Sequence, residues 1–464
     1  MTSIPVISSR RDCHGTVPQT RLSQPLFQEP TFGENGPSHD PTAFSVSHPS
    51  DSAIYKQIGD LAKKKVVAVP PSRQAPQDIY SLASAYGGIG PQVIDQINKA
   101  KSISFHAFGD SGASNARKYF NELRVADQVT LDSASARGQH EPAAFLFHLG
   151  DVVYNFGEAA YYYDQFYEPF RNYPAPIFAI PGNHDSFIVP GTKPDAVPLT
   201  TFQRNFCSPA TVITPEAGSL HRTAMTQPGV YFTLDAPFVR IIGLFSNALE
   251  DPGVISNLSK KWPDVSNIQI DFLRAQLNRI KQEKYAGAVI IAMHHPPFSY
   301  SPKSKSDGTG GNHGCSTEMW AEIDTICHEV GVYPHAVLSG HAHNYQRYTR
   351  LMAFDKFKEI GVPFIVCGDG GHNVNPLVMP RRGEPAQEPN AGSDVTYLEG
   401  PKPVAKVHKL ILAKYDDHNY GYLRIDVDKQ YLKIGFHQVG VRSLAQSRFD
   451  MVTVRLADRH LVAN

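Results

Sequence analysis

The chain has 464 residues, of which 41% are apolar and 19% charged, so it is long enough to bury a large core. Lys and Arg together number 44, as do Asp and Glu, and this balance argues against nucleic acid or an anionic membrane surface as the main partner. No run approaches the roughly 20 apolar residues of a membrane span. The five cysteines are scattered without a metal-binding spacing, which argues against a disulfide framework.

Residues 1–100 differ from the rest of the chain. About the first fifty are rich in Pro, Ser, Thr and Gly without periodicity, which predicts an extended arm, and short helices are expected over 52–65 and 76–86. We expect residues 1–100 to form a partly helical or disordered extension and 101–464 to form one domain. No apolar segment follows the Arg pair near the N-terminus, so we expect no secretory signal and a cytoplasmic location.

From Lys101 onward, short apolar runs alternate with helical patterns. Helices are expected over 115–134, 159–167, 200–206, 268–281 and 316–329. Strands are expected over 102–108, 144–149, 176–180, 231–234, 239–244, 288–293, 335–338 and 364–367, with a hairpin over 421–436. Alternation of this kind is typical of a largely parallel sheet with right-handed crossovers.

Five of these strands end in loops that carry metal-ligand residue types. A single Gly-Asp after a strand is usually a turn or a helix cap, and a single histidine is usually a hydrogen-bonded core residue. Five such loops at strand ends would however lie along one edge, where open α/β sheets bind their ligands. The residues are Asp110; Asp151 with Tyr154; Asn183 with His184 and Asp185; His294; and His341 with His343.

The charges of these side chains indicate how they would divide between two metal ions. One ion would take Asp110, Asp151, a Tyr154 phenolate and His343. The other would take Asp151, Asn183, His294 and His341. Three anionic ligands suit a hard ion such as Fe(III), whereas the imidazole-rich set suits Zn, Fe(II) or Mn. A pair of ions bridged by one carboxylate is typical of in-line displacement at phosphorus.

The series GDSG, GDVVY, GNHD, HHPP and GHAH resembles the five-motif signature of the calcineurin-like metallophosphoesterase superfamily, and most closely its purple acid phosphatase branch. The resemblance covers residues 101–350, with GDGG at 368–371 as looser support. It implies an α/β fold, a four-layer α/β/β/α metallophosphoesterase sandwich, here with an irregular N-terminal extension.

The likeness to the purple branch rests on two positions. Most of the superfamily has Asp-x-His in the first motif, but here the third residue is Gly112, which has no side chain to bind a metal. The resemblance implies that Tyr154 supplies the missing ligand. If Tyr154 is instead only a core tyrosine, the first ion would be held less tightly and would be divalent.

The family pattern also implies individual roles. His294, the first residue of HHPP, would be the ligand, and His295 would lie behind it or assist catalysis. His184 resembles the family histidine that steadies the transition state or protonates the leaving oxygen. Asp185 would orient His184 or cap the loop.

Three residues on the loop over 301–314 are further candidates. His313 would contact the substrate or simply face solvent. Lys303 and Lys305 would meet an anionic leaving group or be exposed. Tyr345 and Arg347, just after GHAH, are expected to support the rim of the site.

The implied activity is hydrolysis of phosphomonoesters, in which a hydroxide held by the two metal ions attacks phosphorus in line. The expected partner is therefore a phosphoester, often a small phosphorylated molecule. A phosphodiesterase for nucleotides or phospholipid head groups is the alternative at the same site. A non-catalytic binding protein is a third possibility, but it would be expected to have lost ligands, and none is missing here.

Overall fold

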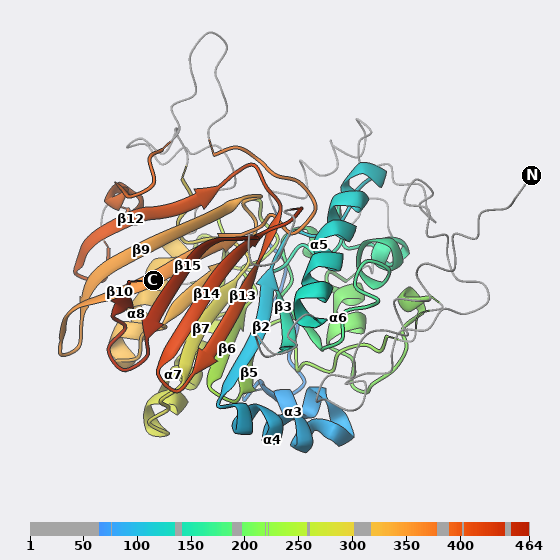
Figure 1. Cartoon of the computed structure of the whole chain (residues 1–464), viewed down its shortest axis with the longest axis horizontal. Coiled ribbons are helices and arrows are strands. Elements are labelled where there is room, and N and C mark those ends of the chain that lie inside the picture. The colour runs from blue at the N-terminus through green and yellow to red at the C-terminus, as the bar shows by residue number, and fades with distance from the viewer. Residues whose placement is uncertain are drawn as a thin grey trace, which may run out of the picture.

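The computed structural model describes residues 65–75, 77–134, 142–187, 197–218, 220, 222–257, 260–300, 317–377, 389–400, 403–440 and 447–463. Within these ranges, two mixed β-sheets pack face to face (Figure 1). The helix expected over 52–65 and the loop with Lys303, Lys305 and His313 lie outside the described residues.

The larger sheet has nine described strands in the order β1-β5-β6-β7-β8-β10-β9-β12-β11. The central strands β6, β7, β8 and β10 run parallel, whereas β9, β11 and β12 continue the sheet in antiparallel fashion. β7 is apolar and buried along its whole length, as expected for a strand covered on both faces. The strands are β1 (Ile79–Ser81), β5 (Phe232–Ala236), β6 (Val239–Leu244), β7 (Ala288–Met293), β8 (Ala336–Ser339), β9 (Tyr345–Phe354), β10 (Phe357–Cys367), β11 (Ser393–Asp394) and β12 (Val407–Asp416).

The smaller sheet has seven described strands in the order β16-β15-β14-β13-β2-β3-β4. Its strands β2, β3 and β4 are parallel, and the expected hairpin is present as β13 and β14. The strands are β2 (Ser102–Phe108), β3 (Ala143–His148), β4 (Ile177–Ala179), β13 (Gly421–Asp428), β14 (Tyr431–Gln438), β15 (Arg448–Arg455) and β16 (Leu461–Val462).

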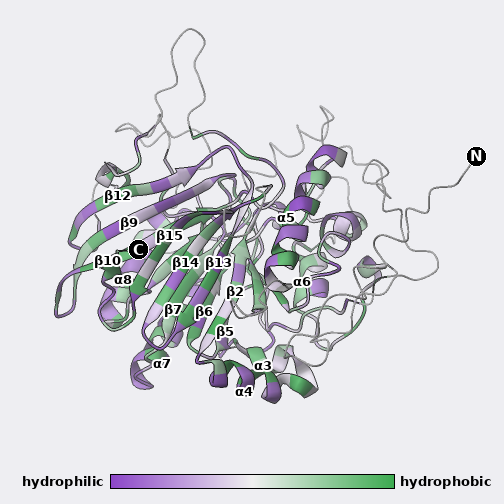
Figure 2. Cartoon of the chain, viewed as in Figure 1, coloured by the Kyte–Doolittle hydropathy of each residue, from purple (hydrophilic) through white to green (hydrophobic). Residues whose placement is uncertain are grey.

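Helices cover the outer faces of both sheets. α5 packs on β13 of the smaller sheet, and α7 packs on β6 of the larger sheet beside α8. In Figure 2, α5 carries alternating hydrophilic and hydrophobic bands, as expected for a helix with one face on a sheet. The four-layer α/β/β/α arrangement is therefore confirmed. The helices are α3 (Leu82–Ala85), α4 (Gly90–Ala100), α5 (Ala116–Ala134), α6 (Thr200–Phe206), α7 (Ile268–Gln282) and α8 (Thr317–Val330).

Aromatic side chains and one ion pair join the two sheets. Tyr345 of β9 stacks on Phe436 of β14 with 3.9 Å between ring centroids. The Tyr345 hydroxyl donates to Asp450 of β15 over 2.7 Å, and Arg347 Nε donates to the same carboxylate over 2.6 Å. These two residues, expected to support the rim of the site, thus connect β9 to the smaller sheet.

A second ion-pair network lies inside the protein around Arg350 of β9. Its guanidinium is 1% exposed and donates to Asp324 of α8 over 3.1 Å and to Glu399 over 2.7 Å. Both carboxylates are also almost fully buried. The Tyr333 hydroxyl lies against the same guanidinium, so one cation holds three segments together.

Part of the N-terminal extension belongs to the larger sheet. Residues 76–86 were expected to form one helix, but β1 occupies Ile79–Ser81 and only α3 is helical. β1 pairs in parallel with β5, so tertiary pairing has overridden the local helical pattern. The division at residue 101 itself stays a prediction. Among the described residues, no helix has both the length and the apolar character to cross a membrane.

Candidate metal centre

The loops that follow β2, β3, β4, β7 and β8 meet at one edge of the molecule. Backbone hydrogen bonds hold them together. Asp110 N donates to Gly150 O over 2.9 Å, and Gly340 N donates to His294 O over 3.0 Å. The two sheets also meet here, because Gly109 N donates to Cys367 O over 2.9 Å. The parallel strands of both sheets thus direct their carboxyl ends to a common place.

Three of the expected ligand atoms form a first cluster. The Tyr154 hydroxyl lies 3.1 Å from Asp110 Oδ1 and 3.2 Å from His343 Nε2. His343 Nε2 lies 3.3 Å from the same Asp110 oxygen. Asp110 and Tyr154 are fully or almost fully buried, and His343 is 8% exposed. One carboxylate, one phenol and one imidazole therefore surround a single small space.

Three others form a second cluster. Asn183 Oδ1 lies 3.0 Å from His294 Nε2 and 3.1 Å from His341 Nδ1. The two imidazole nitrogens are 3.3 Å apart. All three side chains are buried. Each cluster brings together three members of one of the two ligand sets expected from the sequence, and their roles as ligands stay a prediction.

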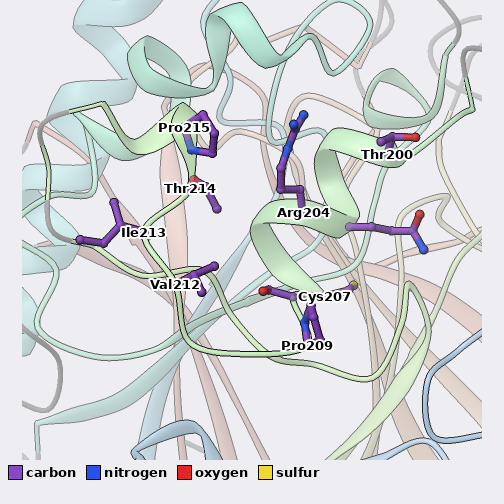
Figure 3. Close-up of a pocket in the computed structure, with 10 residues that line it drawn as sticks. Thr200, Arg204, Cys207, Pro209, Val212, Ile213, Thr214 and Pro215 are labelled. Carbon is purple, nitrogen blue, oxygen red and sulfur yellow. The ribbon is translucent and has the colours of Figure 1, made fainter.

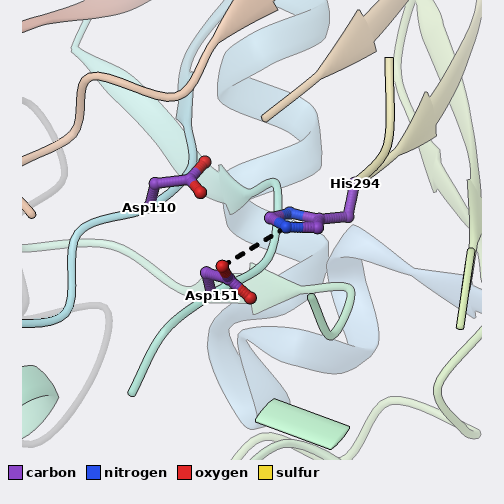
Figure 4. A group of neighbouring side chains, drawn as sticks. All are labelled: Asp110, Asp151 and His294. Atoms are coloured by element: carbon purple, nitrogen blue, oxygen red, sulfur yellow. Dashed lines mark ion pairs between the residues drawn. The ribbon is translucent and has the colours of Figure 1, made fainter. Parts of the chain in front are cut away.

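Asp151 lies between the clusters. Its Oδ2 is 3.4 Å from His294 Nε2 of the second cluster. Ligand atoms of Asp110, Asp151 and His294 all lie within 4.8 Å of one another, and Figure 4 shows the three side chains pointing toward each other. Asp151 is therefore placed where one carboxylate can serve two cations.

The donor set fits a metal ion. His294 Nδ1 donates to Leu149 O over 2.9 Å, so its Nε2 is the nitrogen that faces the amide oxygen of Asn183. At a separation of 3.0 Å, this nitrogen either has a proton and donates it to the amide oxygen, or both atoms are acceptors that a metal ion can hold. A backbone carbonyl that fixes the ligating tautomer is also typical of metal-binding histidines.

Burial and charge set the protonation of two of the expected ligands. Burial lowers the pKa of His294, but the carboxylates of Asp151 and Asp110 outweigh this effect and raise it to about 9. Burial, together with the same carboxylates, raises the pKa of the Tyr154 phenol well above its usual value. A metal ion that binds here must therefore displace protons from both side chains.

The backbone is strained at three of the expected ligands. Asp110, Asp151 and His341 have φ values of 58°, 57° and 67°, in the left-handed region that residues with a side chain rarely adopt. Each such residue costs about 1–3 kcal/mol and persists only where the surroundings enforce it. Three of the twelve described non-glycine residues with positive φ thus lie at expected metal-ligand positions.

His184 lies at the edge of the first cluster and is half-buried. Its Nδ1 donates to Asn155 O over 2.9 Å, and its ring lies 4.3 Å from the Tyr154 ring. Asp185, the next residue, contacts the backbone of the neighbouring loops. Both Asp185 oxygens accept backbone amides, including Val152 N at 3.0 Å and Gly182 N at 2.9 Å. Of the two roles that the sequence left open for Asp185, its contacts match loop capping.

The carboxyl group of Asp185 is unusual in its protonation. Burial and the neighbouring Asp151 carboxylate raise its pKa to about 7, although backbone amides of Gly182, Val152 and Val153 favour the charged form. The group nevertheless faces these amides and not the ligand clusters.

His295 is fully buried behind the second cluster. Its Nε2 donates to Leu249 O over 2.7 Å, and its Nδ1 lies 2.7 Å from Ser246 Oγ. Its ring lies 4.3 Å from that of His341. Both nitrogens are therefore engaged by the protein, which matches a position behind His294 and His341 and not one in contact with a substrate.

Sequence reasoning missed several neighbours of the centre. His372 follows β10 and stacks on Tyr154, with 3.5 Å between ring centroids, and Lys118 of α5 lies 2.9 Å from its Nε2. Glu250 and Asp251, on the loop after β6, approach Asn183 at 3.4 Å and His341 at 3.9 Å. The signal for His372 was its place after GDGG at a strand end, the same pattern as in the five recognised loops.

Gly182 allows the close approach of the loops after β3 and β4. A Cβ atom at Gly182 would overlap both the amide nitrogen and the carboxylate of Asp151. We therefore expect Gly182→Ala to displace this carboxylate, and a displacement of about 1 Å can lower turnover by about 10²-fold. The measurement is the number of metal ions bound per chain together with the initial rate.

The control for this substitution is Gly88→Ala, because nothing lies within 4 Å of a Cβ at Gly88. It should bind metal and turn over like the parent protein. Unchanged metal content in Gly182→Ala would show that the loop can shift to accommodate the methyl group. The close approach of the two loops would then not be needed for metal binding.

A surface pocket of about 430 Å³ lies apart from these clusters, between α6 and the following loop (Figure 3). Arg204, Cys207, Val212 and Ile213 are among its lining residues. Burial raises the pKa of the Cys207 thiol to about 12, so this cysteine is not a thiolate nucleophile. The pocket contains no member of the candidate centre.

Comparison with known proteins bears on the same region. Two solved structures are similar to the chain. The first is "GAP50 the anchor in the inner membrane complex of Plasmodium", with 10% identity and a TM-score of 0.41, and the match covers 74% of this chain and 86% of that one. The second is PhoD, with 12% identity and a TM-score of 0.46, and the match covers 78% of this chain and 71% of that one. At these scores neither likeness bears on the site. No curated protein matches the chain.

The family profile described as calcineurin-like phosphoesterase matches residues 103–345. This range is more than half of the 464 residues, and it contains both clusters of ligand atoms. Members of the family use bound metal ions to hydrolyse phosphoesters, and the described residues include the buried Asp110, Asp151 and His294 group that such chemistry needs. The chain belongs to the calcineurin-like phosphoesterase family.

Proposed function

We propose that the protein hydrolyses phosphomonoesters at a centre of two metal ions. The observation that supports this most strongly is the division of the ligand atoms into two clusters with Asp151 between them. Each cluster has three atoms at mutual distances of 3.0–3.3 Å. The ligands are Asp110, Asp151, Tyr154, Asn183, His294, His341 and His343.

The first cluster is proposed to hold Fe(III), and the second Zn, Fe(II) or Mn. In support, the first cluster combines a carboxylate with a phenol, and both are hard oxygen ligands. Gly112 adds no ligand, and a Cβ there would come within 2.5 Å of Val152 O. Tyr154, whose hydroxyl lies 3.1 Å from Asp110, is therefore the side chain proposed to complete this half of the centre.

Bound at these positions, two cations would lower the pKa of a shared water and offset the charge of the phosphoryl group. His184 is proposed to act on the substrate side. Its ring is fixed by donation from Nδ1 to Asn155 O, and the side chain lies beside the first cluster and is only partly buried. From there it would bind a phosphoryl oxygen or donate a proton to the leaving oxygen.

The test of the substrate class is a paired assay. Initial rates are measured on a nitrophenyl phosphate monoester and on the corresponding bis-ester, from acidic to neutral pH. A strong preference for the monoester with an acidic optimum is expected. A preference for the bis-ester near neutral pH would overturn the proposal in favour of a phosphodiesterase with a divalent metal pair.

Tyr154→Phe tests the iron assignment. With Fe(III) bound, the parent protein is expected to show a tyrosinate-to-iron absorption band, because a ligated phenol is deprotonated by the metal. The band should be absent in Tyr154→Phe, and loss of a hard ligand should weaken iron binding. A colourless parent protein that is fully active without iron would contradict the assignment.

The matched control is Tyr162→Phe. Tyr162 is also fully buried, and its hydroxyl has no hydrogen-bond partner among the described residues. This variant should keep both the band and the metal content of the parent protein.

A further inference from the structure

The Tyr154 ring is held between two imidazoles. His372 stacks on it with 3.5 Å between ring centroids and 17° between ring planes. His184 lies 4.3 Å away at 38°. Two rings at such short distances cannot share one face of a phenol, so they lie on opposite faces. With the side chain 1% exposed, the direction of the phenol oxygen is fixed by these neighbours.

His372 is in turn held at both ring nitrogens. Nδ1 lies 2.5 Å from Gly112 O, and Nε2 lies 2.9 Å from Lys118 Nζ. A carbonyl oxygen only accepts and an ammonium group only donates, so Nδ1 carries the proton and Nε2 accepts. Lys118 Nζ also donates to Ser114 Oγ over 2.9 Å. The ring therefore connects the start of α5 to the first cluster.

His372 is not placed as a ligand itself. Its two nitrogens face Gly112 and Lys118, and its ring lies 5.3 Å from that of His343 in an edge-on arrangement. Its backbone N donates to Asp110 O over 2.9 Å. It thus touches all three members of the first cluster while its own lone pair is used by Lys118.

We propose that His372, oriented by Lys118 and Gly112, is a positioning residue that directs the Tyr154 oxygen at Asp110 and His343. Through this contact it sets the affinity of the first cluster for its metal ion. The inference rests on the proposed role of Tyr154 as a ligand. It adds a second condition for metal binding besides the ligands themselves. The contact between α5 and the loop after β10 must also be intact.

The test measures binding of Zn²⁺ alone to the metal-free full-length chain, by competition with a chelator. Ionisation of tyrosine is followed in the same titration by difference absorbance. His372→Ala is expected to weaken binding of one of the two ions by about 10–100-fold, as for other residues that orient metal ligands, and to shift tyrosinate formation to higher Zn²⁺. Lys118→Met, at a half-buried position, should shift both readouts in the same direction.

His437→Ala is the matched control. His437 is 8% exposed, against 6% for His372, and it stacks on Tyr422 at 17°, but it bonds to Ser447 and touches no proposed ligand. It should leave zinc affinity and tyrosinate formation unchanged.

The outcomes separate the two proposals. If Tyr154→Phe does not weaken Zn²⁺ binding, the proposed ligand set fails. If Tyr154→Phe weakens it but His372→Ala and Lys118→Met behave like His437→Ala, the positioning role is overturned while the ligand set stands.

Discussion

Asp151→Asn is expected to lose both metal ions and nearly all turnover. The Asp151 carboxylate lies between the two clusters, so its charge would serve both cations at once. An amide of the same shape brings no negative charge, and each cation would then face one anionic ligand fewer. We expect turnover to fall on the order of 10³-fold or more, which corresponds to about 4 kcal/mol of transition-state stabilisation.

The measurement combines metal counting with initial rates at saturating metal. The control is Asp132→Asn, another buried carboxylate, which pairs with Arg424 and His106. Asp132→Asn should lower stability but keep the metals, so it separates general destabilisation from loss of the bridge. Retained metal and activity in Asp151→Asn would refute the bridging role.

Arg350→Met is expected to lower the free energy of unfolding by about 3–5 kcal/mol. The substitution removes the cation but leaves the Asp324 and Glu399 carboxylates 1% and 3% exposed. Breaking a buried ion pair by removing one partner costs this much because the remaining charge has neither water nor a counter-ion. The loss of stability should extend beyond β9, because the same guanidinium donates hydrogen bonds to Asp324 of α8 and to Glu399.

Denaturant unfolding of the metal-free protein measures this effect without a contribution from bound metal. Arg455→Met is the comparison, because Arg455 pairs with Asp458 at the surface, where ion pairs contribute little. Equal unfolding midpoints for Arg350→Met and Arg455→Met would show that the buried network is not needed for stability.

The parts of the centre that could be predicted are those encoded locally. Asp110, Asp151 and His294 each stand within three residues of the end of a buried apolar strand. Such a run can be recognised without knowing its neighbours. Because parallel strands place their carboxyl ends at one edge, local patterns were enough to bring these loops together.

The parts that were missed depend on contacts between distant segments. Lys118 and His372 are 254 residues apart. The local sequence around either residue does not predict that the two are in contact. The strand β9 was not predicted because Arg347 and Arg350 interrupt its apolar pattern. Both are paired inside the fold, with Asp450 in one case and with Asp324 and Glu399 in the other. Buried charges of this kind make a strand look like a surface loop.

The left-handed backbone at Asp110, Asp151 and His341 also bears on how this protein would evolve. Glycine adopts such φ values without steric strain, so a lineage released from catalysis would relieve strain by exchanging these residues for glycine. Selection for stability and selection for activity therefore pull in opposite directions at these three positions. A variant with glycine at all three positions is therefore expected to have a less strained backbone and to lose its metal chemistry.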